Sequence, residues 1–211
     1  MAVTQAALLA WLGALQRAYA DNRSYLTDLD AAIGDADHGI NMERGFSAVK
    51  AELDRAAPAD ISSTLKTVAG VLLRSVGGAS GPLYGTFFLR ASAACAGKSQ
   101  LEAADVVAMV EAGLAGVVQR GRASLADKTM VDALSPAVAA MRAALADGAG
   151  LAQILAQGAA AAEQGMKDTI PLQARKGRAS YLAERSIGHQ DPGATSAWLL
   201  LKAAADTWRD G

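Results

Sequence analysis

Cysteine and histidine are scarce in this chain of 211 residues. A single cysteine, Cys95, cannot form an internal disulfide, which is typical of a protein from a reducing compartment, so we expect a cytoplasmic protein. The chain has only two histidines, His38 and His189, and this argues against a transition-metal site built from imidazoles.

An excess of charge of either sign is also missing. The 20 Lys and Arg residues face 21 Asp and Glu residues, giving a formal net charge of −1. Because nucleic-acid binding needs a basic face to neutralise phosphates, and the basic residues are scattered, we expect no nucleic-acid partner. No apolar run reaches roughly 18 residues without a charge, so no membrane span is predicted. The amino-terminal stretch around Trp11 is amphipathic and lacks the basic start of a signal peptide.

Residues that favour strands are few. Valine, isoleucine and the aromatic residues together make up about an eighth of the chain, whereas alanine, the strongest helix former, makes up about a quarter. The length fits one domain with an ordinary core. We therefore predict a single all-α domain over residues 1–211.

The apolar residues recur with helical spacing. Leu8, Leu12 and Leu15 share one face of a helix that Thr4 is expected to cap, and Ser99 with Glu102 has the spacing of a capping box. The predicted helices are 4–20, 22–32, 40–56, 61–76, 82–96, 101–120, 130–147, 150–167 and 193–209, with a turn or helix over 179–187. Eight or nine helices joined by short loops are typical of an antiparallel bundle or a helical barrel.

A segment of ten residues that runs into a predicted loop contains four aspartates: Asp28, Asp30, Asp35 and Asp37. Carboxylates this close repel one another unless a cation neutralises them, and Mg²⁺ is the hard cation that such ligands suit. An equally open alternative is that these aspartates cap turns or are simply solvated. The spacing does not match the calcium loop of an EF-hand. His38 follows the cluster directly and could contact phosphate or serve the structure of the loop.

A glycine-rich segment, Gly77–Gly81, separates two predicted helices. Its free amides and the following helix, with Ser80 as the expected N-cap and Pro82 in the first turn, could bind a phosphate. A tight turn between helices explains the same residues. The sequence Gly97-Lys98-Ser99 ends like a P-loop, but the glycine that the motif needs is replaced by Ser92 and no strand precedes it.

Two later segments carry charged residues. Over 124–132, Asp127 and Lys128 precede a predicted helix, and a solvated cap region is the favoured interpretation for them. Residues 174–195 contain several Arg and Lys residues, three glycines and the turn Asp191-Pro192-Gly193, in a protein that is otherwise neutral. Such a loop could close over a polyphosphate through charge-assisted hydrogen bonds from arginine, or could be an ordinary polar connection.

Taken together, four motifs resemble the nucleotide-binding subunits of dihydroxyacetone kinases. They are LDAAIGDADHGINM (29–42), GGASGPLYGT (77–86), KTMVDALSPA (128–137) and GRASYLAERSIGHQDPGATS (177–196), in the right order over nearly the whole chain. The resemblance implies an antiparallel barrel of about eight helices with the nucleotide at one end. It also implies ADP or ATP and two Mg²⁺ ions as cofactors.

The resemblance also assigns residues. The metal ligands fall on Asp30, Asp35 and Asp37. The nucleotide-binding residues implied by the same motifs are Asn41, Gly78, Ala79, Ser80, Thr129, Met130, Arg178, Asp191, Pro192 and Gly193. Arg178 and His38 are the expected catalytic residues. Ala36 and Ala183 stand where the family usually has glycine, and at a positive φ an alanine costs about 1 kcal/mol.

The implied reaction is phosphoryl transfer, which needs positioning and charge neutralisation more than covalent help. In this family the ketone is held by a separate subunit, so a dihydroxyacetone-binding kinase subunit is an expected partner. A free-standing chain of this length resembles the phosphoenolpyruvate-dependent form, in which bound ADP is rephosphorylated by a phosphohistidine protein. Two alternatives remain: an ATP-dependent kinase subunit for another short sugar or polyol, and an ADP-bound regulatory module. A homodimer is also left open.

Overall fold

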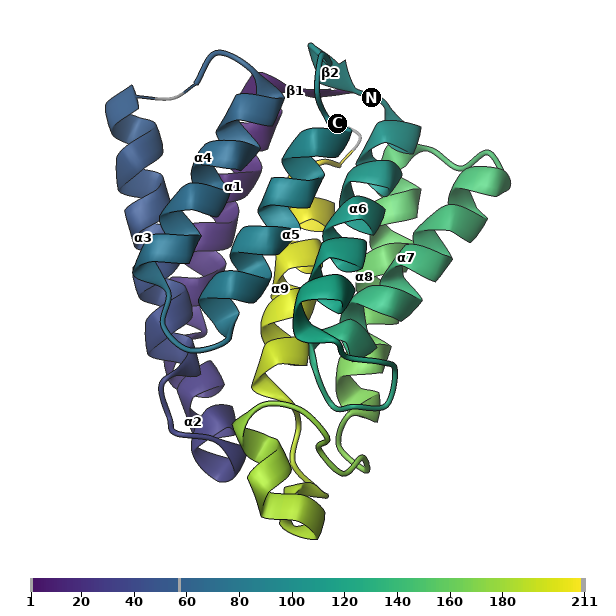
Figure 1. Ribbon diagram of the computed structural model, residues 1–211. Coiled ribbons are helices and arrows are strands. Elements are labelled where there is room, and N and C mark those ends of the chain that lie inside the picture. Colours follow the sequence, from purple (N-terminus) through teal and green to yellow (C-terminus); the bar gives the residue numbers. More distant parts are fainter. Residues whose placement is uncertain (1, 57, 210–211) are drawn as a thin grey trace.

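The computed structural model describes residues 2–56 and 58–209, and most of these residues are helical (Figure 1). Short loops join the helices. The elements are β1 Val3–Thr4, α1 Gln5–Asp21, α2 Arg23–Ile33, α3 His38–Ala56, α4 Ile61–Ser75, α5 Ser80–Ala94, β2 Gln100–Leu101, α6 Ala103–Gly121, α7 Met130–Ala146, α8 Leu151–Asp168, the 3₁₀ segment η1 Arg178–Ser186, and α9 Pro192–Thr207.

Eight of these helices form a closed ring. Each of α3, α4, α5, α6, α7, α8 and α9 packs against the next helix in the ring, and α9 packs against α1, which in turn contacts α3. Neighbours run in opposite directions (Figure 1). Helix α2 lies outside the ring and covers one of its ends, where it contacts α3, α9 and η1. The prediction of an all-α antiparallel barrel is confirmed.

The alternation of direction decides where the loops lie. Because consecutive ring helices run up and down, every second connection falls at the same end of the barrel. The connections before α3, α5, α7 and α9 therefore meet at the end covered by α2 and η1, while β1, β2 and the last turn of α9 lie at the opposite end (Figure 1). The four motifs of the sequence occupy these four connections.

Most of the aromatic side chains of the chain are buried in the interior of the ring, among its aliphatic residues. The rings of Trp11 and Trp208 lie 5.1 Å apart, and those of Tyr19 and Phe46 lie 4.7 Å apart. Each indole N–H is satisfied, because Trp11 donates to the carbonyl of Leu200 and Trp208 to that of Ala7. The aromatic cluster ties α1 to α9, and so closes the ring between the first and last helices.

Helix ends show where local signals succeed and fail. Thr4 caps α1 as predicted, accepting a hydrogen bond from the amide of Ala7 at 3.3 Å. The predicted capping box at Ser99 is wrong. Glu102 is the N-cap of α6 and forms a capping box with Asp105 instead. The physical reason is the β1–β2 ladder, which pairs residues 100–101 with residues 3–4 and delays the start of the helix.

No helix within the described residues is both long and apolar enough to cross a membrane.

Candidate functional site

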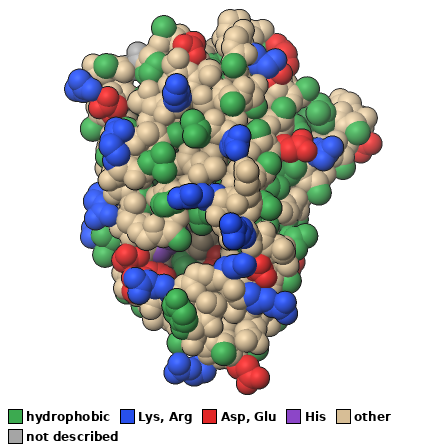
Figure 2. Space-filling model, in the orientation of Figure 1, with side chains coloured by type: hydrophobic (Ala, Val, Ile, Leu, Met, Phe, Trp, Pro, Cys, Tyr) green, Lys and Arg blue, Asp and Glu red, His purple; other side chains and the backbone are tan. Residues whose placement is uncertain are grey.

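A cavity of about 360 Å³ opens at the end of the barrel where the four motif connections meet. Figure 2 shows this hollow between the barrel and the lobe formed by η1, with acidic side chains at one edge and basic ones around it. The residues predicted for the site that line it are Asp30, Asp35, Asp37, His38, Gly78, Ala79, Ser80, Thr129, Met130, Arg178, Asp191, Pro192 and Gly193.

Four helices begin at this cavity. The first residues of α3, α5, α7 and α9, which are His38, Ser80, Met130 and Pro192, all line it. A helix N-terminus presents free amides and a partial positive charge, so it favours an anion. The direction of alternate helices thus brings four helix N-termini to the cavity, and their partial positive charge adds to that of the basic side chains that line it.

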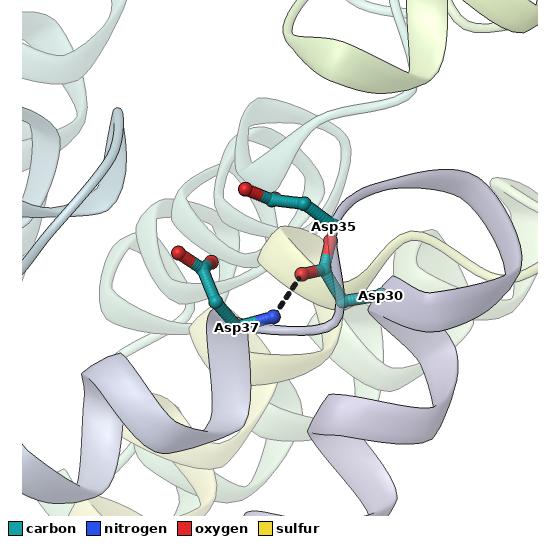
Figure 3. Close-up of side chains that lie close together, drawn as sticks. All are labelled: Asp30, Asp35 and Asp37. Atoms are coloured by element: carbon teal, nitrogen blue, oxygen red, sulfur yellow. Dashed lines mark hydrogen bonds between the residues drawn. The ribbon is translucent and has the colours of Figure 1, made fainter.

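The three predicted metal ligands lie together (Figure 3). Oxygen atoms of Asp30, Asp35 and Asp37 fall within 4.8 Å of one another. Asp30 is buried, and its Oδ2 accepts hydrogen bonds from the amides of Asp37 at 2.8 Å and His38 at 3.1 Å. These bonds hold the buried carboxylate in place beneath the more exposed pair. Asp28, the fourth acid of the segment, is exposed and lies outside the cluster.

The connection that carries the acids has a demanding backbone. Ala36 has φ +60°, the condition under which an alanine at this position is strained. At Gly34 a β-carbon would lie 2.0 Å from Oδ1 of Asp30, and only glycine leaves that oxygen its position. Both features bring Asp35 and Asp37 back toward the end of α2.

The acidic cluster fits a hard cation. Carboxylate oxygens are the donors that Mg²⁺ prefers, and three of them converge at the edge of a cavity that anions would also favour. Arg178 of η1 faces the cluster from the other side, with Nε 3.0 Å from Oδ2 of Asp35. The cavity therefore holds the two kinds of charge that a metal-bound polyphosphate needs, acids for the metal and a guanidinium for phosphate oxygens.

His38 lies at the base of the cavity in a buried hydrogen-bond chain. Its Nε2 is 2.9 Å from Oγ of Ser196, and its Nδ1 is 3.1 Å from Oγ of Ser80. Ser196 donates its one hydroxyl proton to the carbonyl of Gly193, so it accepts from Nε2 of His38 and from the hydroxyl of Tyr84. Nδ1 is then the acceptor for Ser80. Burial lowers the pKa of His38 below its usual range, against the pull of Asp30 and Asp37, which favours this neutral form.

The glycine-rich connection differs from its prediction in one detail. Ser80 is the first residue of α5 and the N-cap is Ala79. The Ser80 hydroxyl therefore does not accept the expected hydrogen bond from a backbone amide, and it contacts His38 instead. Gly78 adopts φ +63°, with open space where a side chain would be. Gly78 and Ala79 line the cavity at the start of α5, where the first amides of the helix have no partner within the helix.

The start of α7 forms a mostly apolar wall. Thr129 caps the helix through a capping box with Asp132, whose Oδ2 accepts from the amide of Thr129 at 2.7 Å. Met130 is buried beside it. Sequence reasoning missed the apolar residues that complete this wall, which are Leu83, Val117, Ala123 and Val131. In the sequence these residues have the pattern of ordinary core positions in helices. Only their meeting at the end of the barrel identifies them as residues of the site.

Asn41 is the one predicted site residue that does not line the cavity. It is buried one turn inside α3, where its Oδ1 accepts a hydrogen bond from Arg44 at 2.6 Å. A β-carbon on Gly77 would lie 3.1 Å from the same oxygen. Asn41 therefore supports the glycine-rich connection from behind.

Lys128 corrects the sequence interpretation. The residue is 1% exposed, so the favoured interpretation as a solvated cap is wrong. Its Nζ donates to backbone carbonyls of the connection before α9, at Thr169 (2.7 Å), Leu172 (3.1 Å) and His189. Asp127 is buried as well. These acceptors lie 41 to 61 residues away along the chain, beyond the reach of any local pattern.

The connection before α9 supplies the cover of the cavity. Gly177, Arg178 and Ala179 line it, together with Lys176, which sequence reasoning noted only as part of a basic run. Asp191 caps α9, accepting from the amide of Ala194 at 2.6 Å. Burial raises the pKa of Asp191 to about 7, although that hydrogen bond and Lys128 oppose the shift. Arg120, at the end of α6, is a further lining cation that the sequence did not single out.

A family model described as the DAK2 domain matches residues 32–206. The chain belongs to the DAK2 domain family. This confirms the resemblance that the four motifs indicated. The DAK2 match contains the cavity and nearly all of the residues that line it.

The chain is also similar to known proteins in sequence and to a solved structure in fold. The chain is 44% identical over 205 residues to the ADP-binding subunit DhaL of the phosphoenolpyruvate-dependent dihydroxyacetone kinase of Escherichia coli, covering 97% of this chain and 98% of the relative. It is 39% identical to the corresponding subunit of the Lactococcus lactis enzyme, over 92% and 93% of the two chains. The dihydroxyacetone kinase of C. freundii, solved with AMP-PNP and Mg²⁺, matches this DAK2-family fold with a TM-score of 0.75 at 25% identity, over 98% of this chain and 34% of that one.

Proposed function

We propose that this chain is the nucleotide-binding subunit of a phosphoenolpyruvate-dependent dihydroxyacetone kinase. The observation that carries the proposal is the joint placement of three carboxylates, a guanidinium and four helix N-termini around one cavity. Near full-length similarity to subunits named as ADP-binding supports it.

We infer that Asp30, Asp35 and Asp37 hold two Mg²⁺ ions together with the phosphates of ADP or ATP. When bound, Mg²⁺ neutralises phosphate charge and keeps the transferring group in line. The three aspartates are already arranged to hold the metal ions. Asp30 is fixed by two amides, whereas Asp35 and Asp37 are more exposed and can rearrange around an incoming nucleotide.

The nucleotide is positioned by the remaining walls. The amides of Gly78, Ala79 and Ser80 bind phosphate oxygens at the start of α5, where the helix dipole favours negative charge. The apolar wall at Met130 packs against the nucleobase of the bound nucleotide, with Thr129 beside it. The turn Asp191-Pro192-Gly193 forms the floor at the start of α9.

Arg178 and His38 are the proposed catalytic residues. Arg178 is 69% exposed on its side chain, so its guanidinium is free to move from Asp35 to the transferring phosphoryl group and stabilise charge there. His38 holds the Ser80 hydroxyl through Nδ1 and is itself held by Ser196. It thereby sets the geometry of the phosphate end without carrying a charge of its own.

Transfer requires partners. The sequence offers no constellation that would hold a small ketone, so the substrate is bound by a separate dihydroxyacetone-binding subunit. A phosphohistidine protein supplies the phosphoryl group to bound ADP. Both partners reach the nucleotide through the opening of the cavity, where Arg178 lies.

The test is reconstitution. The purified chain is mixed with the dihydroxyacetone-binding subunit and the phosphohistidine donor of a relative, and dihydroxyacetone phosphate is measured with ADP or ATP as the only nucleotide. We expect product with substoichiometric ADP, and ADP that survives dialysis and exchanges slowly. Rapid exchange and a need for stoichiometric ATP would show the ATP-dependent kinase instead. Bound ADP that never accepts phosphate would show a regulatory module.

A further inference from the structure

The buried ammonium of Lys128 lies between the two ends of the covering loop, defined here as residues 169–191. We propose that Lys128 is a positioning residue that holds the two ends of this loop together, and so keeps Arg178 and the rest of the cover over the nucleotide site. The inference rests on the proposed function only for the identity of the ligand under the cover.

The contacts of the ammonium join both ends of the loop. At the start of the loop, Nζ of Lys128 lies 2.7 Å from the carbonyl oxygen of Thr169 and 3.1 Å from that of Leu172, with Ile170 at 3.4 Å. At the end of the loop it donates to the carbonyl of His189. Residues 173–188, which lie between these contacts, form the cover and include all of η1.

Few other hydrogen bonds join the two ends of the covering loop. The amide of Gly188 donates to the carbonyl of Ile170 at 2.8 Å, and the amide of Asp191 donates to Oγ1 of Thr169 at 3.0 Å. Both are neutral. The ammonium is the charged donor that bridges the two ends, and hydrogen bonds from a charged donor are the stronger ones.

The conformation and burial of Lys128 are both energetically unfavourable, which argues that the residue has a functional role. Lys128 has φ +62°, a left-handed conformation that residues other than glycine avoid. Burial lowers the pKa of its ammonium, against the pull of Asp191 and Asp132, so the charge is held in an environment that disfavours it. Strain and buried charge persist where the surrounding structure fixes them, and such sites are often functional.

Lys128 also connects two walls of the site. Its backbone directly precedes Thr129 and Met130, which line the cavity at the start of α7, while its side chain fixes the loop that carries Arg178. The amide of Arg175 adds a second link by donating to the carbonyl of Asp127 at 3.0 Å. Lys128 and its neighbour Asp127 therefore link the wall to the cover.

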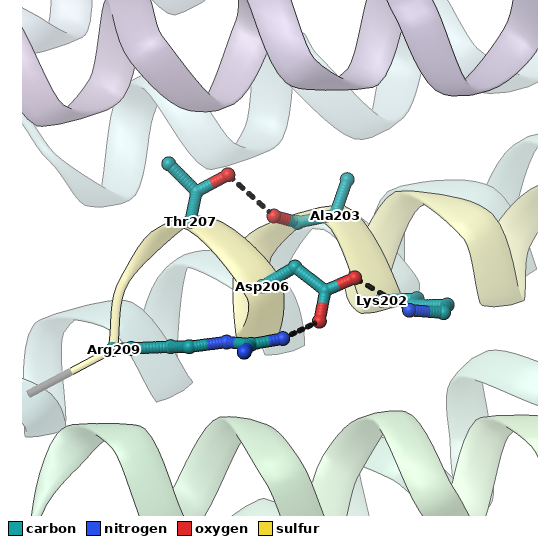
Figure 4. A network of polar contacts seen from close by, with 5 residues as sticks. All are labelled: Lys202, Ala203, Asp206, Thr207 and Arg209. Atoms are coloured by element: carbon teal, nitrogen blue, oxygen red, sulfur yellow. Dashed lines mark hydrogen bonds and ion pairs between the residues drawn. The ribbon is translucent and has the colours of Figure 1, made fainter.

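The test compares Lys128→Met with Lys202→Met. Lys202 lies on the surface of α9 in an exposed ion pair with Asp206, far from the cavity, and Figure 4 shows it with Arg209 on the same carboxylate. Such a pair contributes little to stability, so Lys202→Met controls for the loss of a lysine. Circular dichroism checks that both variants are folded.

Two readouts are taken. In the presence of Mg²⁺, the dissociation rate of ADP is expected to rise about tenfold or more in Lys128→Met and to stay unchanged in Lys202→Met. Without nucleotide, trypsin is expected to cut faster at the exposed Arg175, Arg178 and Arg185 of the covering loop in Lys128→Met. Equal ADP release and equal cleavage in the two variants would overturn the proposal. Failure of the wild type to bind ADP would count against the proposed function and leave the cleavage comparison decisive.

Chemical rescue covers the case in which Lys128→Met does not fold. Lys128→Ala leaves four carbonyl oxygens around the space of the lost side chain. Ethylammonium can donate to them, whereas tetramethylammonium has no N–H. We expect ethylammonium alone to slow ADP release and tryptic cleavage of Lys128→Ala, and equal effects of the two cations would overturn the proposal.

Discussion

Single residues in the site hold backbone conformations that their side chains disfavour. Ala36, Lys128 and Ala183 have φ between +50° and +62°, and each belongs to a connection at the cavity end. Ala183 interrupts η1 with ψ −124°, far from any helical value. The strain is stored where the loops must bend back over the cavity.

Replacing Ala36 by glycine should relieve part of this strain. Ala36→Gly is expected to raise the free energy of unfolding by about 1 kcal/mol, because glycine adopts a positive φ without a steric penalty. Urea titration of the nucleotide-free protein measures it. Ala160→Gly, at an exposed position in the middle of α8, should instead lower stability by about 1 kcal/mol. A glycine at 36 that leaves stability unchanged or lower would show that the loop does not strain alanine.

Asp191 gives the fold a pH dependence of definite sign. Its pKa is raised to about 7, so between about pH 4 and pH 7 the native protein retains a proton that the unfolded chain has released. Stability from this group is therefore present at low pH and is lost as the pH rises through the window. Asp191→Asn keeps a capping side chain but cannot ionise, so its melting temperature should fall less than that of the wild type between about pH 5 and pH 8. Parallel curves would contradict the raised pKa.

What the sequence can say about single residues depends on how far away their partners are. Thr4 as a cap was predictable, since its partner Ala7 is three residues along. Ser80 was assigned to a local cap and instead contacts His38, 42 residues away. Lys128 was misjudged for the same reason, because the carbonyls that make its burial tolerable come from another connection.

At the scale of elements, the site is built from helix starts and the connections before them. The connection between α2 and α3 brings Asp35 and Asp37 back to Asp30, and the start of α3 supplies the amides that hold Asp30. The geometry depends on the shape of this connection as much as on the ligands it carries.

Gly34→Ala tests the shape of the connection. The new β-carbon would lie 2.0 Å from Oδ1 of Asp30, so the carboxylate must move. We expect the affinity for Mn²⁺, used as a paramagnetic substitute for Mg²⁺, to fall about tenfold to a hundredfold, with helical content retained. Gly148→Ala, in the turn between α7 and α8 at the other end of the barrel, strains a residue at φ +78° and should leave Mn²⁺ binding unchanged. Electron paramagnetic resonance titration measures both, and equal losses would refute the role of Gly34.

The helices themselves were predictable, since alanine-rich segments with apolar residues at helical spacing leave little alternative. Their ends were less so. Helix α6 starts at Ala103 and not at 101, because residues 100–101 pair with β1. A β-ladder with only two residues in each strand is too short to show the alternation of polar and apolar residues by which a strand is predicted from sequence.

At the scale of the whole molecule, antiparallel order turns four weak motifs into one site. Each motif alone was compatible with an ordinary turn. Ring closure through α1 and α9 and the alternation of direction bring all four connections to one end. The near-zero net charge conceals a local separation, with acids on the α2–α3 connection and Arg178 opposite. The sequence could indicate the motifs, but their meeting depends on the number and direction of the helices between them.

Ligand binding should stabilise the molecule as a unit. Because the cavity is formed by four connections that separate on unfolding, ADP with Mg²⁺ binds only the folded chain and raises its melting temperature by mass action. We expect a chelator added to the loaded protein to lower the melting temperature to that of the nucleotide-free protein. Differential scanning fluorimetry checks this, with the chelator on nucleotide-free protein as the control. A chelator that leaves the loaded protein unchanged would separate nucleotide binding from the metal.

We propose that Asp30, Asp35 and Asp37 bind nucleotide through Mg²⁺. Isothermal titration of ADP into the wild type and into the double variant Asp35→Asn/Asp37→Asn, with Mg²⁺ and with a chelator, tests it most directly. We expect tight binding only for the wild type with Mg²⁺, and loss of binding in the double variant at unchanged helical content. Equal ADP affinity in the two proteins, or wild-type affinity that does not depend on Mg²⁺, would contradict it.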